Sequence, residues 1–190
     1  DQIKTTFDSN SNKVVIVYRD QGNSDHGTVR VGTVSGTSIS FGSTVVFYST
    51  DTTTNGIAVT FDSNANKVVI AYTADGSTSP FTGYGTAIVG TVSGTSISFG
   101  SAAVFESAYT SYTSATFDSN ANKVVIAYKD SGNSQYGTAI AGTVSGTSIS
   151  FGSAAVFESA STENTSATFD SSNNKVVIAY KDSGNSQYGT

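Results

Sequence analysis

Gly32-Thr-Val-Ser-Gly-Thr-Ser-Ile-Ser-Phe-Gly-Ser43 decides the fold of this 190-residue chain, because the same stretch returns letter for letter at residues 90–101 and 142–153. A second motif, Phe-Asp followed by a run that ends in Lys-Val-Val-Ile-(Ala/Val)-Tyr, sets the period. This motif begins at Phe7, Phe61, Phe117 and Phe169. Subtracting successive Phe positions gives spacings of 54, 56 and 52, so the chain is a tandem repeat of about 52 residues.

The repeat divides the chain into units that we expect to belong to one larger repeat domain. Unit 1 covers residues 1–60, unit 2 covers 61–116, unit 3 covers 117–168, and a partial unit 4 covers 169–190. In one repeat, which begins at the end of unit 2 and continues through unit 3, small and β-branched residues predict strands at 113–118, 123–128, 136–144 and 148–157. The segments between them are rich in the turn formers Asp, Asn, Ser and Gly, and Gly152 predicts a kink in the last strand. Each complete unit is therefore predicted to form four short antiparallel strands, and unit 4 to hold the first two.

An all-β fold of β-propeller-like tandem repeats is our prediction from these units, because four antiparallel strands in about 50 residues match one propeller blade. The small residues of the predicted first strands favour this fold, since the innermost strands of a propeller crowd around a central channel. A β-solenoid or a stacked-sheet array is the alternative. A propeller has at least four blades, so we expect closure through self-association or through missing repeats of a longer parent chain.

Composition excludes several classes of partner. The net charge is −5 and the nine Lys and Arg residues are spread singly along the chain, so no basic patch is available to bind nucleic acid. No apolar run reaches the roughly 18 residues that membrane insertion requires. Cysteine is absent, which excludes disulfides and thiolate chemistry. Poverty in Cys, Met and Trp with abundant Ser, Thr, Asn and Gly is typical of an extracellular or virion-surface protein.

The units differ from one another mainly at one end. In an antiparallel four-stranded unit, the loops after the second and fourth strands share an end, and both length differences between units fall in these loops. Variable loops on a rigid scaffold commonly carry recognition. Their Tyr, Asn and Asp side chains suit contacts with surface glycans or with another virion protein. The predicted ligand-binding residues are Tyr48, Asp51, Asn55, Phe81, Tyr84, Tyr109, Tyr112, Glu163 and Asn164.

Motifs that resemble metal or catalytic sites are better interpreted as structure. Oxygen-bearing side chains alternate after each Phe, as at the start of a calcium loop, but Lys replaces the turn glycine. We therefore predict Asx turns and no cofactor. The weaker calcium candidates are Asp8, Asn10, Asn12, Asp62, Asn64, Asn66, Asp118, Asn120 and Asn122.

Catalytic groups are not evident in the pattern. The segment that begins at Asp130 departs from the Asp-box of sialidases, and His26 has no recognisable triad partners. Glycoside hydrolysis requires two carboxylates in unlike environments, whereas nearly every Asp of this chain recurs at an equivalent position in each unit. We therefore predict that the chain is not an enzyme.

Two stretches carry a resemblance to known proteins: Phe-Asp-Ser-Asn-Ala-Asn-Lys-Val-Val-Ile-Ala-Tyr at residues 117–128, and the repeated stretch at residues 142–153. They resemble tandem-repeat virion structural and tail-fibre-like proteins of marine cyanobacterial phages and related bacterial surface repeat proteins, over essentially the whole chain. The resemblance implies a surface structural or adhesive role and no catalytic residue. We predict a non-enzymatic structural or adhesive module of a virion or cell surface with one diversified recognition face. The alternatives are a lectin-like glycan-binding propeller and, after it, a sialidase-type glycoside hydrolase.

Overall fold

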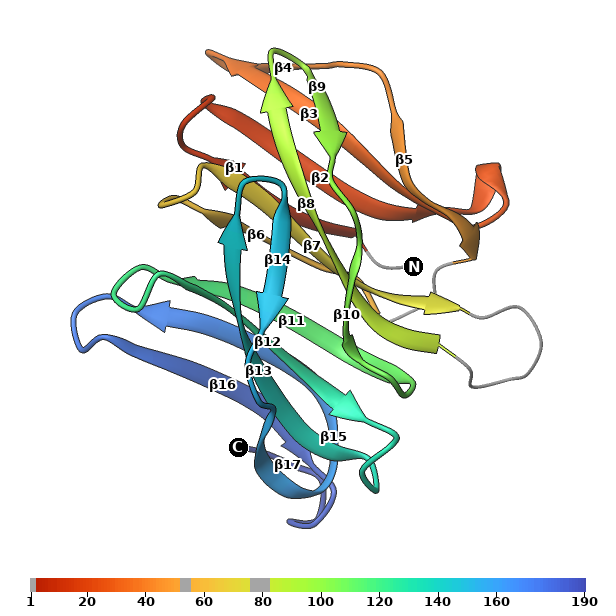
Figure 1. Ribbon diagram of the computed structural model, residues 1–190, viewed down its shortest axis with the longest axis vertical. Coiled ribbons are helices and arrows are strands. Elements are labelled where there is room, and N and C mark those ends of the chain that lie inside the picture. Colours follow the sequence, from red (N-terminus) through yellow and green to blue (C-terminus); the bar gives the residue numbers. More distant parts are fainter. Residues whose placement is uncertain (1–2, 52–55, 76–82) are drawn as a thin grey trace.

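The computed structural model describes residues 3–51, 56–75 and 83–190, and the regular structure of these residues is almost entirely β. Their only helical element is one 3-10 turn, η1 (Gln21–Asn23). None of their helices is long and apolar enough to cross a membrane. The strands form antiparallel sheets that curl into a half-barrel (Figure 1). The predicted all-β class is therefore confirmed.

Three sheets follow one another along the chain. The first contains β1 (Ile3–Asp8), β2 (Lys13–Asp20), β3 (His26–Ser35), β4 (Ser38–Phe41) and β5 (Val45–Asp51). The second contains β6 (Ala58–Asp62), β7 (Lys67–Asp75), β8 (Gly83–Ser93), β9 (Ser96–Phe99) and β10 (Ala103–Glu106). The third contains β11 (Thr110–Asp118), β12 (Lys123–Asp130), β13 (Tyr136–Ser145), β14 (Ser148–Phe151), β15 (Ala155–Asp170), β16 (Lys175–Asp182) and β17 (Tyr188–Gly189).

The strand predicted as the fourth of each unit is split in two. In the first sheet β1 pairs with β2 and β2 with β3, while the end of β3 pairs with β4 and its beginning with β5. The break lies at Gly42, whose N–H donates a hydrogen bond to the Val31 carbonyl at 2.9 Å. The third sheet has the same register, with β14 and the start of β15 on either side of Gly152. The split therefore falls at the glycine for which the sequence predicts a kink.

β15 extends beyond the predicted strand, because it runs without interruption from the fourth strand of unit 3 into the first strand of unit 4. Its first part pairs with β13 and its second part with β16. A register shift between Glu163 and Ser166 marks a β-bulge, and Asn164 within it has φ of 53°. A bulge bends a strand and increases its twist, which lets β15 leave one sheet pairing and enter the next.

Side-chain chemistry within the turns closes the hairpins. After each first strand, an Asp Oδ1 accepts hydrogen bonds from the backbone N–H groups two and three residues later. Asp118, for example, accepts from Asn120 and Ala121, both at 2.9 Å. In all four copies the turn ends on an Asn with φ between 52° and 56°, a conformation that Asn tolerates. These segments are therefore Asx turns, as the sequence predicts.

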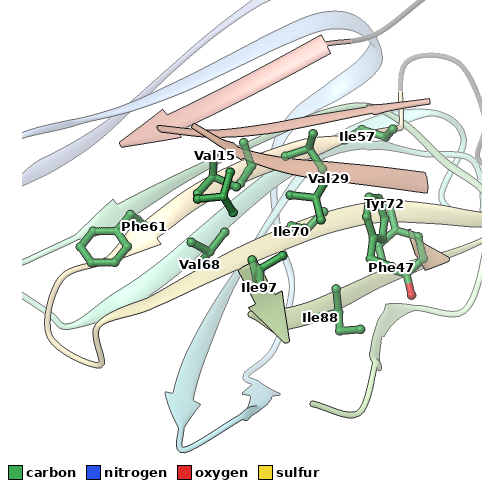
Figure 2. Packing of buried hydrophobic residues seen from close by; sticks show 13 residues of the cluster. Val15, Val29, Phe47, Ile57, Phe61, Val68, Ile70, Tyr72, Ile88 and Ile97 are labelled. Atoms are coloured by element: carbon green, nitrogen blue, oxygen red, sulfur yellow. The ribbon is translucent and has the colours of Figure 1, made fainter. Parts of the chain in front are cut away.

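Two hydrophobic cores lie between the sheets. Figure 2 shows the first core, to which the first sheet contributes Val15, Val29 and Phe47. The second sheet contributes Ile70 and Tyr72 to the same core. A second core joins the second and third sheets; its buried members include Val69, Ala71, Val89, Val124 and Ile126. The second sheet thus packs apolar residues on both faces, which explains why its second strand, β7, reads as a continuous β-branched run.

The first strands of the units lie side by side. β1 lies beside β6, β6 beside β11, and β11 beside β15. Across the last of these contacts, Ser114 Oγ and Thr165 Oγ1 are 3.2 Å apart. Small side chains permit this close approach of neighbouring sheets, and they leave the hollows described below.

Candidate functional site

The loops predicted to carry recognition meet at one end of the sheets. The N–H of Ser131, in the loop between β12 and β13, donates to the carbonyl of Tyr109, in the connection between β10 and β11, at 3.0 Å. An equivalent bond of 3.0 Å joins the N–H of Ser183 to the carbonyl of Ser161. We call this end, formed by residues 21–25, 107–109, 131–135 and 183–187, the loop end.

The structure places most of the predicted ligand-binding residues on strands close to the loop end. Tyr48 and Asp51 belong to β5, Tyr84 to β8, and Tyr112 to β11. Glu163 and Asn164 belong to β15, and Tyr109 lies between β10 and β11. Asn55 and Phe81 lie outside the described residues. Of the described tyrosines in this set, Tyr84 is the most accessible, with 52% of its surface exposed.

Tyr48 contributes to packing between sheets. Its ring lies 5.1 Å from that of Tyr72, and Tyr72 in turn meets Phe47 edge-on at 5.2 Å. Burial raises the pKa of Tyr72 to about 12, with a smaller contribution from Tyr48. Tyr48 therefore differs from Tyr84, because its position is fixed by the junction between the first two sheets.

Tyr112 and Asn164 occupy equivalent bulges and share an unusual backbone conformation. Their φ angles are 51° and 53°, in the left-handed region, which Asn tolerates but a bulky residue such as Tyr rarely adopts. Lys129 Nζ lies 5.7 Å from the centre of the Tyr112 ring, a distance that permits a cation–π contact. Glu163 forms an ion pair of 3.0 Å with Lys181. Strained backbone of this kind concentrates at functional sites, so the bulge at Tyr112 is a candidate contact site near the loop end.

A phenol donates to a carboxylate at two equivalent places, once between the second and third sheets and once between β15 and β16 of the third sheet. Tyr128 Oη donates to Glu106 Oε2 at 3.3 Å, and Tyr180 Oη donates to Glu158 Oε2 at 3.0 Å. Burial raises the pKa of the Glu106 carboxyl, and the charge of Asp130 raises it further. Because the same arrangement recurs, we interpret it as a structural link between strands. In the described part of the chain, no group of three or more His, Cys, Asp or Glu side chains could hold a metal ion.

The Asp residues among the calcium candidates accept hydrogen bonds from the chain itself. Asp8 Oδ1 accepts from the N–H groups of Asn10 and Ser11 at 2.9 and 3.0 Å, and Asp62 does the same with Asn64 and Ala65. These bonds define the Asx turns, and the Asn that ends each turn has a positive φ.

A cavity that the sequence analysis did not anticipate lies at the opposite end of the first strands, beside the Asx turns. Its volume is about 480 Å³. Each first strand contributes a Thr-Phe pair to its lining, and two turn serines complete it. The residues are Thr6, Phe7, Thr60, Phe61, Ser63, Thr116, Phe117, Ser119, Thr168 and Phe169. The signal was present in the sequence, because Thr-Phe precedes the turn Asp in every copy, but each pair is about 52 residues from the next.

Ser, Thr and Phe residues line this turn-end cavity. A second, smaller hollow of about 160 Å³ lies along the same strands. Lys4 is the one charged residue in the lining of the two, which otherwise consists of Ser, Thr, Ala, Val and Phe. Such a lining can form hydrogen bonds and stack against a flat apolar face. It supplies no pair of groups for acid–base or nucleophilic chemistry.

No known protein family matches the chain, and no curated protein matches it.

Proposed function

We propose that this chain is a non-enzymatic structural or adhesive module of a virion or cell surface, built as a β-propeller-like array of four-stranded blades. One observation carries the proposal: sheets of the same strand order and register pack face to face, while the differences between units gather at the loop end. A scaffold that repeats while its loops diverge suits a surface module that presents variable contacts.

The propeller-like arrangement is supported by the place of the first strands. They lie side by side and line shared hollows, as the innermost strands of propeller blades do around a channel. All strand pairs in the described residues are antiparallel, whereas a parallel β-solenoid stacks its strands in parallel. Closure into a ring by self-association or by further repeats belongs to this proposal.

Recognition is assigned to the loop end, with Tyr84 and Tyr112 as the principal contacts. Tyr84 is exposed, and Tyr112 is held in a strained conformation beside Lys129. Aromatic side chains of this kind stack on sugar rings or anchor protein contacts. Surface glycans and other virion proteins are the proposed partners, in an extracellular or virion-surface setting.

Two experiments test the proposal. Immunogold electron microscopy of the source particles or cells, with antibodies against this chain, is expected to label their surface; labelling confined to the interior would contradict it. Binding to a glycan microarray and to intact cells is expected to fall with Tyr84→Ser and to persist with Phe41→Ser, which removes an exposed ring away from the loop end. Turnover of chromogenic glycosides would instead support the sialidase-type alternative.

The turn-end cavity favours a second candidate, a lectin-like glycan-binding module. Thr and Phe residues of four strands line this cavity, and residues of these types can hold a sugar by stacking and hydrogen bonding. Thr116→Val removes one lining hydroxyl at nearly constant volume. Loss of glycan binding with Thr116→Val but not with Tyr84→Ser would place recognition in the turn-end cavity.

A further inference from the structure

The junction between the first two sheets defines two kinds of apolar face. The first sheet presents what we call its forward face, which consists of Val15, Val17, Val29 and Val31 and is almost completely buried. The second sheet presents its rear face, which consists of Ile57, Phe61, Val68, Ile70, Tyr72, Ile88 and Ile97. The junction between the second and third sheets is built in the same way. The forward face of the second sheet contributes Val69 and Ala71, and the rear face of the third sheet contributes Val124 and Ile126. The chain therefore contains the same forward-to-rear contact twice.

The rear face of the first sheet is uncovered, although its first two strands keep the residue types of the buried copies. Ile3, the counterpart of Ile57, is 67% exposed, whereas Ile57 is 0% exposed. Phe7 is 54% exposed, whereas its counterpart Phe61 is 9% exposed. A hollow of about 260 Å³, lined by Ile3, Ile16, Tyr18, Arg30 and Phe41, opens on this face. Large apolar groups clustered on a surface mark a site of interaction.

The forward face of the last hairpin is uncovered as well. Val177 of β16 is 50% exposed, whereas Val69, its counterpart in β7, is 0% exposed. Ala179 is exposed, and its counterpart Ala71 is buried. The uncovered forward face thus carries the same side chains that elsewhere in the chain contact a rear face.

Resting on the self-association included in the proposed function, we propose that a second copy of this chain docks head to tail, with the forward face of the β15–β16 hairpin of one copy against the β1–β2 part of the rear face of the next. The two uncovered faces are the halves of a contact that the chain already makes twice internally. A contact between two different faces is heterologous, so it repeats and yields either a closed ring or an open fibre.

Arg30 explains which part of the rear face is used. It replaces Ile88 and Ile140 of the buried copies, its guanidinium lies 5.3 Å from the centre of the Phe41 ring, and its Nε donates to the Gly42 carbonyl at 2.9 Å. Covering this charge with an apolar sheet would be costly. We therefore infer that the β15–β16 hairpin covers the β1–β2 part and leaves Arg30 in water.

The test is the mass of the full chain in solution, measured by sedimentation and light scattering over a range of concentrations. The wild-type mass is expected to rise with concentration above the 19.5 kDa of one chain. Ile3→Glu at the rear face and Val177→Glu at the forward face are each expected to weaken association at least about tenfold, because each would bury an unpaired carboxylate. Both residues are exposed within one copy, so neither change should disturb folding, which circular dichroism checks.

Val104→Glu is the matched control. Val104 is 53% exposed and lies on β10, away from both uncovered faces, so this variant adds the same charge and is expected to associate as the wild type does. Equal loss of association in all three variants would show a general effect of charge and overturn the proposal.

A mixture of the two interface variants distinguishes this contact from a symmetric one. Ile3→Glu keeps its forward face and Val177→Glu keeps its rear face, so together they are expected to form a dimer of twice the chain mass that cannot grow. A wild-type chain that stays monomeric at every concentration, or a mixture that stays monomeric while the wild type associates, would overturn the proposal. Because Tyr84 and Tyr112 take no part, loss of loop-end binding and loss of self-association are separate results.

Discussion

At the scale of single residues, Gly42 and Gly100 show how closely neighbouring sheets approach. A methyl group at Gly42 would overlap the backbone carbonyl of Thr95, and one at Gly100 would overlap that of Thr147. Gly152 is the third copy of this position, and a methyl group there would meet only the Ala141 carbonyl, at 3.8 Å. The close packing of a neighbouring sheet therefore requires glycine at positions 42 and 100. At the equivalent position 152, no neighbouring sheet restricts the side chain.

Alanine at these glycines is expected to have unequal effects. Gly100→Ala should lower the free energy of unfolding by about 2 kcal/mol or more, because backbone atoms must move to relieve the overlap. Gly152→Ala should change it by less than about 0.5 kcal/mol. Urea unfolding of the two variants measures the difference, and equal losses would show that the sheets are not held this closely.

Tyr72 links stability to alkaline pH. Its pKa is raised by burial to about 12, against about 10 for an unfolded tyrosine, so the folded state favours the neutral phenol. The stabilisation of the folded state by the neutral Tyr72 phenol is fully present below pH about 10 and is lost as the pH rises toward about 12. Tyr72→Phe keeps the ring contact with Phe47 and is expected to flatten the loss of stability across this window.

Urea unfolding at stepped pH values measures that change, with Tyr84→Phe as the control for an exposed phenol. Equal flattening by both variants would assign the pH dependence to the tyrosines in general and contradict the role of Tyr72.

At the scale of strands and turns, the sequence was informative wherever structure depends on neighbouring residues. The run predicted at 123–128 corresponds to β12, which extends to Asp130, because β-branched residues and the flanking turns define it locally. The Asx turns were predictable for the same reason. The union of two predicted strands in β15 was not, since it depends on a bulge and on pairing with two partner strands.

The Asx turns can be tested one hydrogen-bond acceptor at a time. Asp118→Ala leaves the N–H groups of Asn120 and Ala121 without their acceptor and is expected to cost about 1 kcal/mol, which corresponds to a fall of about 2–4 °C in Tm for a chain of this size. Asp118→Asn retains an Oδ1 acceptor and should cost less than half as much. Calorimetry gives both values, and a full loss with Asn would mean that the negative charge, not the acceptor, stabilises the turn.

At the scale of the whole molecule, the two cores make stability depend on position along the chain. Each sheet is stabilised by contacts with its neighbours only, so a sheet with a neighbour on one side is less stable than a sheet with neighbours on both sides. Phe105 meets Tyr128 and Phe151 at 5.2 and 5.7 Å, whereas Phe157 near the end of the chain meets Tyr180 at 5.1 Å. Val177 on β16 is half exposed, while the equivalent Val69 on β7 is buried.

Hydrogen exchange followed by mass spectrometry is expected to show this gradient. The amides of β7 and β12 should exchange slowest, and those of β16 should exchange fastest among the second strands, because one edge of β16 is paired only at its last residues. Uniform protection of all second strands at low protein concentration would contradict it.

Long-range features explain what sequence reasoning missed in the candidate site. The turn-end cavity is assembled from Thr-Phe pairs that are distant in the chain, and only the side-by-side placement of β1, β6, β11 and β15 brings them together. Tyr48 is a predicted ligand-binding residue, and the contact of its ring with Tyr72 of the next sheet could not be inferred from the sequence. The alternation of residues along a strand indicates that a side chain points toward one face, but not which neighbour lies against it.

The repeated contact between sheets also has a consequence for inheritance. Residues 90–101 and 142–153 are identical in sequence, so in-frame recombination between the gene segments that encode them would delete or duplicate about 52 residues. Every sheet in the longer or shorter product would still find a matching neighbour. Such a gene can therefore change the length of its product in a single genetic event without first evolving a new interface.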